Sequence, residues 1–209
     1  MNKQKEGKII LDLCGGTGSW SKPWEDNGYD VRLITLPEQD VKTYKLPNEQ
    51  IYGILAAPPC TMFSIARTTA KLPRDLNGAM EVVSACLKLI WSARANNGLK
   101  FWALENPRGL LRQFLGNPAM TFQQWQYGDG ISKYTDLWGY FNKPTPKVRQ
   151  KPTILNSHLA GKWQSPTAPE EYKHLNLDRA GIRSITSTGF ANAFYQANKP
   201  KGASNSSQG

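Results

Sequence analysis

Cysteine and histidine are scarce in this chain, and their scarcity excludes two classes of protein. The sequence contains three cysteines and two histidines among 209 residues. Cys14, Cys60 and Cys86 form neither the even set of a disulfide framework nor the close pairs of a zinc site. We therefore expect no structural metal and no fold stabilised by disulfide bonds.

Long apolar runs are also missing. No uninterrupted apolar stretch could cross a bilayer, and the chain does not start with a charged and then apolar leader. We therefore expect a cytoplasmic protein that does not insert into membranes. At 39% hydrophobic composition, residues 1–198 suit one domain, and the Ser/Gly-rich residues 199–209 are expected to form a disordered tail.

Acidic residues are the minority among the charged residues. Lys plus Arg number 26 and Asp plus Glu number 16, which gives a formal net charge of +10. Such an excess favours a polyanionic partner such as nucleic acid, although scattered lysines on many soluble proteins are simply solvated.

The periodicity of the apolar residues predicts an α/β fold. Short apolar runs predict strands at 8–13, 31–34, 40–43, 53–57 and 100–104, and residues 121–127 and 136–141 read as an antiparallel pair. Helical spacing or stop signals predict helices at about 20–26, 76–95, 109–115 and 189–198. We expect a mostly parallel sheet with an antiparallel pair late in the chain and helices on both faces. Residues 142–178, with five prolines and no sustained period, read as a small irregular insert.

Three short stretches stand at predicted strand ends, where open α/β sheets bind their ligands. Pro58-Pro59 cannot continue a strand, so the chain turns and displays Cys60, although an isolated cysteine is more often a small buried hydrophobe. Residues 12–18 form a glycine loop without the full dinucleotide fingerprint or a P-loop lysine, and it could be an ordinary tight turn. Glu105 precedes Asn106-Pro107 and could equally be a carboxylate at the entry to a helix.

Taken in this order, the three stretches resemble the cytosine-5 DNA methyltransferase family, in its compact, phage-type form. The resemblance implies a Rossmann-like class I methyltransferase sheet, S-adenosylmethionine as cofactor, and DNA as partner, with the target cytosine flipped or single-stranded. It implies that Cys60 adds to C6 of the base and that Glu105 holds the base, while Pro59, Ser64 and Lys133 complete the catalytic set.

The resemblance also implies the residues of two binding sites. Those of the cofactor are Asp12, Cys14, Gly15, Gly16, Thr17, Gly18, Asp40, Pro58, Thr186 and Gly189, of which Asp40 matches the contact to the adenine amino group. Those of DNA are Arg67, Lys71, Arg74, Arg108 and Lys133. No metal site is implied.

The sequence departs from the family pattern at two places. Thr35 or Leu36 stands at the end of the second strand, where the family has an acidic residue for the ribose hydroxyls. Lys133-Tyr134-Thr135 stands where the family has an Arg-x-Arg pair. Two other functions therefore stay open: transfer of another group to C5 of a cytosine base or free nucleotide, and a catalytically inactive nucleic-acid-binding protein on the same fold.

Overall fold

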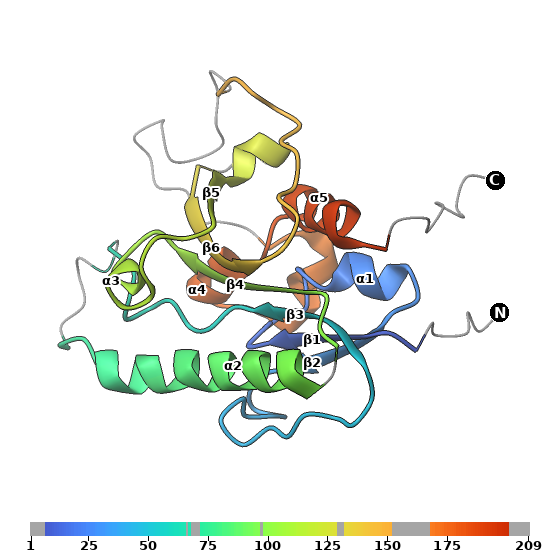
Figure 1. Ribbon diagram of the computed structural model, residues 1–209. Coiled ribbons are helices and arrows are strands. Elements are labelled where there is room, and N and C mark those ends of the chain that lie inside the picture. Colours follow the sequence, from blue (N-terminus) through green and yellow to red (C-terminus); the bar gives the residue numbers. More distant parts are fainter. Residues whose placement is uncertain are drawn as a thin grey trace.

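The computed structural model describes residues 7–65, 67, 72–96, 98–128, 132–151 and 168–200. Six strands form one sheet in the order β2-β1-β3-β4-β6-β5 (Figure 1). Their bounds are β1 Ile9–Leu13, β2 Asp30–Ile34, β3 Ile51–Ala56, β4 Phe101–Pro107, β5 Met120–Gln123 and β6 Tyr134–Tyr140. The first four strands are parallel, whereas β6 runs antiparallel to both β4 and β5. The predicted Rossmann-like α/β fold is confirmed.

Helices cover both faces of the sheet, as Figure 1 shows. The long helix α2 (Leu76–Asn96) packs on one face, and α1 (Lys22–Asp26) and α5 (Thr188–Asn198) pack on the other. All five residues of β1 are buried because a parallel strand between two helical layers meets apolar side chains on both sides. This explains why β1 reads in the sequence as a continuous apolar run.

The two faces of the sheet have cores of different composition. The α2 face is mainly aliphatic, with Val83, Cys86 and Ile90 of the helix fully buried. The α5 face is aromatic: Trp24 stacks on Phe101 at 5.1 Å between ring centroids and meets the edge of Tyr195 at 4.8 Å. The aromatic core holds the last helix against the first strand and loop of the chain.

Three local expectations are wrong. Residues 40–43 form a turn and no strand, because the side chain of Asp40 accepts a hydrogen bond from Lys42 N at 2.9 Å and its carbonyl accepts one from Thr43 N at 3.0 Å. Strand β4 continues to Pro107, so Glu105 lies in a strand paired with β6 and does not enter a helix. Residues 124–127 form a short 3-10 helix, η1 (Gln124–Tyr127), so only the first part of 121–127 is a strand.

Other segments add elements to those expected. The helix predicted at 109–115 is α3 (Leu111–Leu115), and the described end of the insert contains η2 (Glu170–Leu175). The short helix α4 (Arg179–Ser184) follows it and was not expected. Trp91 of α2 is 52% exposed and does not belong to the buried face of the helix. Lys71, residues 152–167 of the insert and residues 201–209 of the tail lie outside the described residues.

Candidate active site

The candidate site lies at the carboxyl ends of the parallel strands. Strand β2 lies on one side of β1 and β3 on the other, so the strand order reverses at β1. Open α/β sheets bind ligands in the crevice that such a reversal creates. The glycine loop follows β1, and the Pro-Pro-Cys turn follows β3. The structure therefore brings the first two sequence motifs to one edge of the sheet.

A side chain from the third motif holds the Pro-Pro-Cys turn in place. Asn106 of β4 is fully buried and donates from Nδ2 to the carbonyl oxygen of Pro58 at 2.9 Å. Beyond the prolines, Phe63 N and Ser64 N both donate to the carbonyl of Cys60, at 3.0 and 2.9 Å. The cysteine thus lies on a compact turn that is tied to the strand carrying Glu105.

A second set of hydrogen bonds connects the chain after Cys60 to the loop between β4 and α3. Leu110 N donates to Phe63 O at 2.9 Å, and Ser64 forms an isolated antiparallel bridge with Gly109. The guanidinium of Arg74 donates to the carbonyls of Met62 and Ser64. Arg74 was expected to bind DNA, and in this structure it binds the backbone beside the turn.

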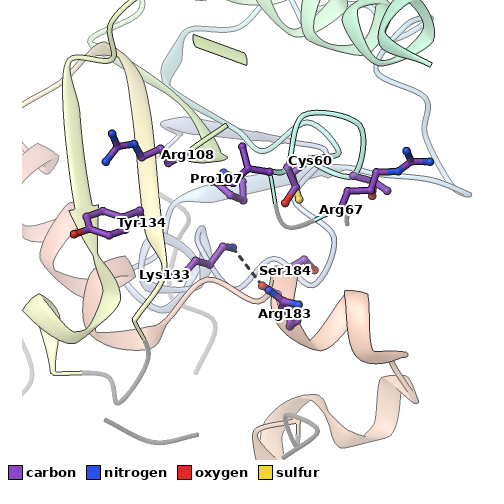
Figure 2. A pocket seen from close by; sticks show the side chains of 11 residues that line it. Cys60, Arg67, Pro107, Arg108, Lys133, Tyr134, Arg183 and Ser184 are labelled. Atoms are coloured by element: carbon purple, nitrogen blue, oxygen red, sulfur yellow. Dashed lines mark hydrogen bonds between the residues drawn. The ribbon is translucent and has the colours of Figure 1, made fainter. Parts of the chain in front are cut away.

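A cavity of about 410 Å³ opens beside Cys60 (Figure 2). Its wall comes from the turn after β3, the end of β4, the start of β6, and α4. The lining residues are Cys60, Thr61, Ser64, Ile65, Arg67, Pro107, Arg108, Lys133, Tyr134, Arg183 and Ser184. Four of them are cationic and none is acidic. The predicted residues Cys60, Ser64, Arg67, Arg108 and Lys133 are therefore gathered around one space.

The start of β6 meets α4 across this cavity. Lys133 Nζ donates to the carbonyl of Arg183 at 3.4 Å, and Figure 2 shows this contact opposite Cys60. Burial raises the pKa of the Cys60 thiol, and the positive charge of Lys133 opposes this rise. The cavity therefore combines a partly buried thiol with cations that favour its thiolate.

Glu105, on strand β4, lies near Lys133 as well. Burial raises the pKa of its carboxyl, Lys133 opposes the rise, and the negative charge of Asp136 adds to it. A raised pKa favours the protonated carboxyl, which can both donate and accept a hydrogen bond. Cys60, Glu105 and Lys133 thus form one electrostatic group, since Glu105 also raises the pKa of Cys60.

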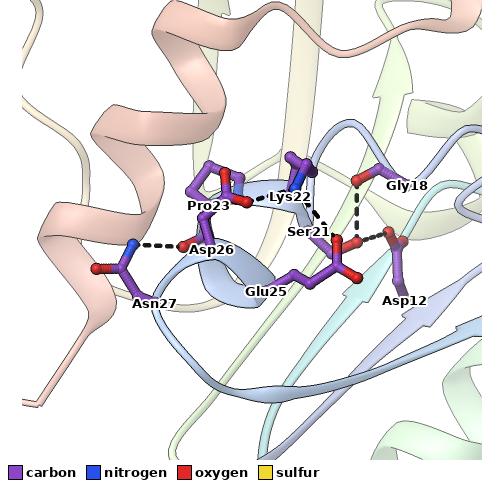
Figure 3. Close-up of polar contacts among 8 residues, drawn as sticks. All are labelled: Asp12, Gly18, Ser21, Lys22, Pro23, Glu25, Asp26 and Asn27. Carbon is purple, nitrogen blue, oxygen red and sulfur yellow. Dashed lines mark hydrogen bonds and ion pairs between the residues drawn. The ribbon is translucent and has the colours of Figure 1, made fainter. Parts of the chain in front are cut away.

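The glycine loop surrounds a buried carboxylate (Figure 3). Asp12 is fully buried, and its Oδ2 accepts a hydrogen bond from Ser21 Oγ at 2.6 Å. Its Oδ1 has no hydrogen-bond partner in the described part of the chain. Burial raises the pKa of Asp12 to about 7, and the bond from Ser21 opposes the rise. Such an oxygen suits a ligand that brings a cationic donor.

The backbone of the loop passes very close to this carboxylate. A Cβ atom at Gly15 would lie 2.3 Å from Oδ1 of Asp12, so only glycine fits there. Gly16 and Gly18 have φ of +56° and +71°, which glycine adopts without strain. Cys14 and Thr17 are half-buried in the same loop. The loop provides close backbone approach together with an unsatisfied acid.

The chain returns to the glycine loop before its last helix. Thr186 N donates to Ser19 Oγ at 2.8 Å, which brings two segments far apart in sequence side by side. Gly189 follows in the first turn of α5. Leu36, at the end of β2, is 70% exposed, and Asp40 is half-buried in the turn that follows. Asp12, Thr186 and the glycines thus gather at β1, while Asp40 lies beyond β2.

Sequence reasoning missed the roles of three residues of this site. Asn106 and Ser21 bind the Cys60 turn and Asp12, while Tyr134 lines the cavity. One signal was available for Asn106: side chains alternate along a strand, so its amide points to the opposite face from Glu105 and needs a buried partner. No local pattern marks Ser21 or Tyr134, because their roles depend on the three-dimensional arrangement.

The part of the chain that the structure describes contains no membrane-spanning helix and no metal-binding cluster. No helix there combines the length and apolar character needed to cross a membrane. No three His, Cys, Asp or Glu side chains there come together as ligands of a metal ion.

Comparisons with known proteins found a likeness to solved structures. No protein-family model matches the chain, and no curated protein does. A solved structure from E. coli, described as a candidate DNA modification methyltransferase encoded within a prophage, superimposes with a TM-score of 0.45 at 16% sequence identity. The match covers 64% of this chain and 46% of the other, so the chain spans less than half of that protein.

Proposed function

We propose that this protein is a DNA methyltransferase that uses S-adenosylmethionine to methylate C5 of cytosine through a covalent bond to Cys60. The observation that carries the proposal is the hydrogen bond from Asn106 to Pro58 O, 2.9 Å long, which joins the Cys60 turn to the strand of Glu105. It keeps Cys60, which lines the cation-lined cavity, close to the strand of a carboxyl whose charge acts on the thiol. Cytosine-5 chemistry requires these two groups on one base.

Cys60 supplies the nucleophile. C5 of cytosine is a weak nucleophile, and addition of a thiolate to C6 turns the C5–C6 unit into an enamine that attacks a methyl donor readily. Formation of the C6–S bond pushes an electron pair through the ring toward N3. The positive charge of Lys133 opposes the effect of burial on the thiol and so favours the thiolate that attacks.

Glu105 neutralises the charge that the attack creates. Its protonated carboxyl donates to N3 of the base, and its other oxygen accepts from the exocyclic amine. Burial raises the pKa of Glu105, which favours the protonated carboxyl over the carboxylate. After methylation the C5 proton leaves to water, the C6–S bond breaks, and the proton on N3 returns to Glu105.

The residues of the glycine loop fit the methyl donor. When bound, S-adenosylmethionine supplies an electrophilic methyl group on a sulfonium. Asp12, with its unpartnered oxygen, would hold the ammonium of the methionine end. Gly15 allows the backbone to approach, and Thr186 closes the loop through Ser19. We keep Asp40 as the proposed contact to the adenine.

An oligonucleotide that carries 5-fluorocytosine tests the proposal. Fluorine at C5 cannot leave as a proton, so the thiol cannot be expelled and the methylated adduct accumulates. With S-adenosylmethionine present, we expect mass spectrometry to find the base on Cys60, and Cys60→Ser to form no adduct. Glu105→Gln should fold and bind the cofactor but lose most of the turnover, because an amide cannot supply the ring proton.

Matched cysteine variants make this experiment decisive. Cys86 of α2 is fully buried and Cys14 lies in the glycine loop, so Cys86→Ala and Cys14→Ala remove thiols that are not nucleophiles in the proposal. Cys86→Ala should trap DNA as the wild type does. An adduct that maps to Cys14 or Cys86, or product from Cys60→Ser at a near wild-type rate, would show that the proposed chemistry is wrong.

A further inference from the structure

An exposed aromatic side chain lies at the rim of the cavity. Tyr134 opens strand β6 and is 51% exposed. The guanidinium of Arg108 lies over its ring, 5.6 Å from the centroid. Figure 2 shows both side chains on the side of the cavity away from Cys60. The Arg108–Tyr134 pair therefore stands next to the place proposed for the reacting base and not inside it.

Strand geometry fixes this arrangement. Arg108 N donates to Tyr134 O at 3.0 Å, which holds the two residues side by side across β4 and β6. Lys133 precedes β6 and reaches the carbonyl of Arg183 across the cavity, while the half-exposed ring of Tyr134, the first residue of β6, lines the same cavity. The pair is built on rigid strands and not on a long loop.

The surroundings of the pair suit a polyanion with flat bases. Arg67, Arg108, Lys133 and Arg183 line the cavity without any acidic residue among its lining groups. Ile65, on the same wall, is 64% exposed. Proteins bind single-stranded nucleic acid with this combination, in which cations follow the phosphates and aromatic rings stack on the bases. A base inside an intact duplex is covered on both faces by its neighbours, whereas a base in a single strand can stack on a side chain without the loss of a base pair.

We propose that Tyr134 and Arg108 form a stacking platform for the nucleotide next to the target cytosine, and that the substrate is therefore single-stranded DNA. The proposal rests on the proposed function, because it takes the Cys60 cavity as the place of the target base. The neighbouring base stacks on the Tyr134 ring, and Arg108 binds the phosphate that joins the two nucleotides. The tyrosine hydroxyl has no part in this contact.

The chain offers matched controls for the platform. Tyr140 stands at the other end of the same strand and is 70% exposed, so Tyr140→Ala removes the same side chain from the same strand. Trp91 on α2 is 52% exposed and carries Arg94 at 5.2 Å from its ring, which repeats the pairing of an arginine with an exposed aromatic far from the cavity.

The experiment measures binding without chemistry. The probe is a short oligodeoxythymidine with one cytosine flanked by the fluorescent base 2-aminopurine. Stacking on an aromatic ring is expected to quench the fluorophore, and loss of the ring should weaken binding about 5- to 100-fold in Tyr134→Ala. Tyr134→Phe should bind and quench as the wild type does. Tyr140→Ala and Trp91→Ala should also match the wild type, and the same sequence in a duplex should bind more weakly.

Two results would overturn the platform. One is wild-type binding and quenching in a Tyr134→Ala protein that melts at the wild-type temperature, and the other is a duplex that binds as tightly as the strand. The 5-fluorocytosine assay separates this proposal from the proposed function. Quenching without any Cys60 adduct would reject the chemistry and keep the platform, whereas an adduct that forms equally well in Tyr134→Ala at subsaturating DNA would reject only the platform.

Discussion

At the scale of single residues, the site depends on acids and a thiol that are held away from water. Asp12 is fully buried with one oxygen unpartnered, and burial also raises the pKa of Glu105 and of Cys60. Burying such groups costs stability unless a partner compensates. For the two acids the proposed ligand is the compensating partner: an ammonium for Asp12 and the cytosine ring for Glu105. The free protein therefore carries strain that binding relieves.

Asp12 should make the stability of the free protein depend on pH. Its pKa is about 7 when folded and near 3.8 otherwise, so the folded state binds more protons between these values. The free energy of unfolding then falls as the pH rises from about 4 to about 7. In Asp12→Asn this fall should be smaller, as measured by urea denaturation across that range. Parallel curves for the two proteins would contradict the assignment.

The same acid should couple cofactor binding to the loss of a proton. An ammonium binds the carboxylate and not the carboxyl, so the affinity for S-adenosylhomocysteine should rise through pH 7 and level off above it. Calorimetry at pH 6.5 in two buffers of different ionisation enthalpy measures the protons released. We expect release from the wild type and less from Asp12→Asn. Equal release from both would place the coupling on another group.

At the scale of secondary-structure elements, two sets of contacts hold the Cys60 turn. One is the hydrogen bond from Asn106, and the other is the bridge between Ser64 and Gly109. Both reach it from β4 or the loop that follows. The turn has no regular structure of its own, and its shape depends on these neighbours. Strand β4 thus carries Glu105 and also fixes the position of the nucleophile.

Gly109→Ala should break the bridge between Ser64 and Gly109. A Cβ there would lie 2.3 Å from the carbonyl oxygen of Phe63, a backbone atom that cannot move alone. We expect faster alkylation of Cys60 by iodoacetamide and less adduct with 5-fluorocytosine DNA. Gly116→Ala is the control, since its φ of +73° makes alanine strained but no atom lies within 4 Å. It should lower stability by about 1 kcal/mol and leave Cys60 reactivity unchanged.

The pairing of β6 with its neighbours includes a partly buried ion pair. Asp136 is fully buried and accepts from Arg112 Nε at 2.6 Å and from Thr121 Oγ1 at 2.7 Å. Arg112→Leu leaves the carboxylate without its cation and should cost about 3 kcal/mol in the free energy of unfolding. Arg94→Leu removes an exposed arginine whose guanidinium lies over the ring of Trp91 and should cost below about 1 kcal/mol. Equal losses would mean that Asp136 finds another partner.

The elements that could be predicted from sequence are those with a long period or a strong stop signal. Helix α2 and strand β1 are examples, because each buries a continuous apolar pattern. Helix α4 could not be predicted, since its six residues are too short to show a period, although Asp178 accepts from Gly181 N as a helix cap. The end of β4 was missed because pairing with β6 overrides the tendency of Pro107 to end a strand.

The candidate site was partly predictable, because its motifs lie next to apolar strands that can be recognised in the sequence. Cys60, Glu105 and the glycine loop follow apolar strands, so their common edge could be predicted from the order of the elements. Asn106 and Tyr134 could not be assigned a role, since their contacts come from strand pairs and turns that only the folded chain brings together. Arg74 shows the converse: a basic residue in a polar loop suggested DNA, yet it bonds two carbonyls.

At the scale of the whole molecule, part of the excess of positive charge lies where the proposed substrate would bind. The chain carries +10 in all, and four cations line the cavity with no acid among the lining residues. Elsewhere, cations such as Lys22 and Arg32 pair with acids on the surface. The net charge can therefore attract a nucleic acid over distance, while the lining cations fix its phosphates.

The distinction between the cations of the cavity and those elsewhere on the surface predicts which charges determine the salt dependence of DNA binding. Each phosphate neutralised on a single strand contributes about 0.7 to the slope of log K against log salt, because a condensed counterion is released. Arg108→Gln and Arg183→Gln should each flatten the slope by about that amount, as measured by the fluorescence anisotropy of labelled oligodeoxythymidine. Lys88→Gln makes the same charge change on the exposed side of α2 and should leave the slope unaltered. If Lys88→Gln flattens the slope as much as the cavity variants do, then the charge acts through the whole surface, and the cavity is not where the phosphates bind.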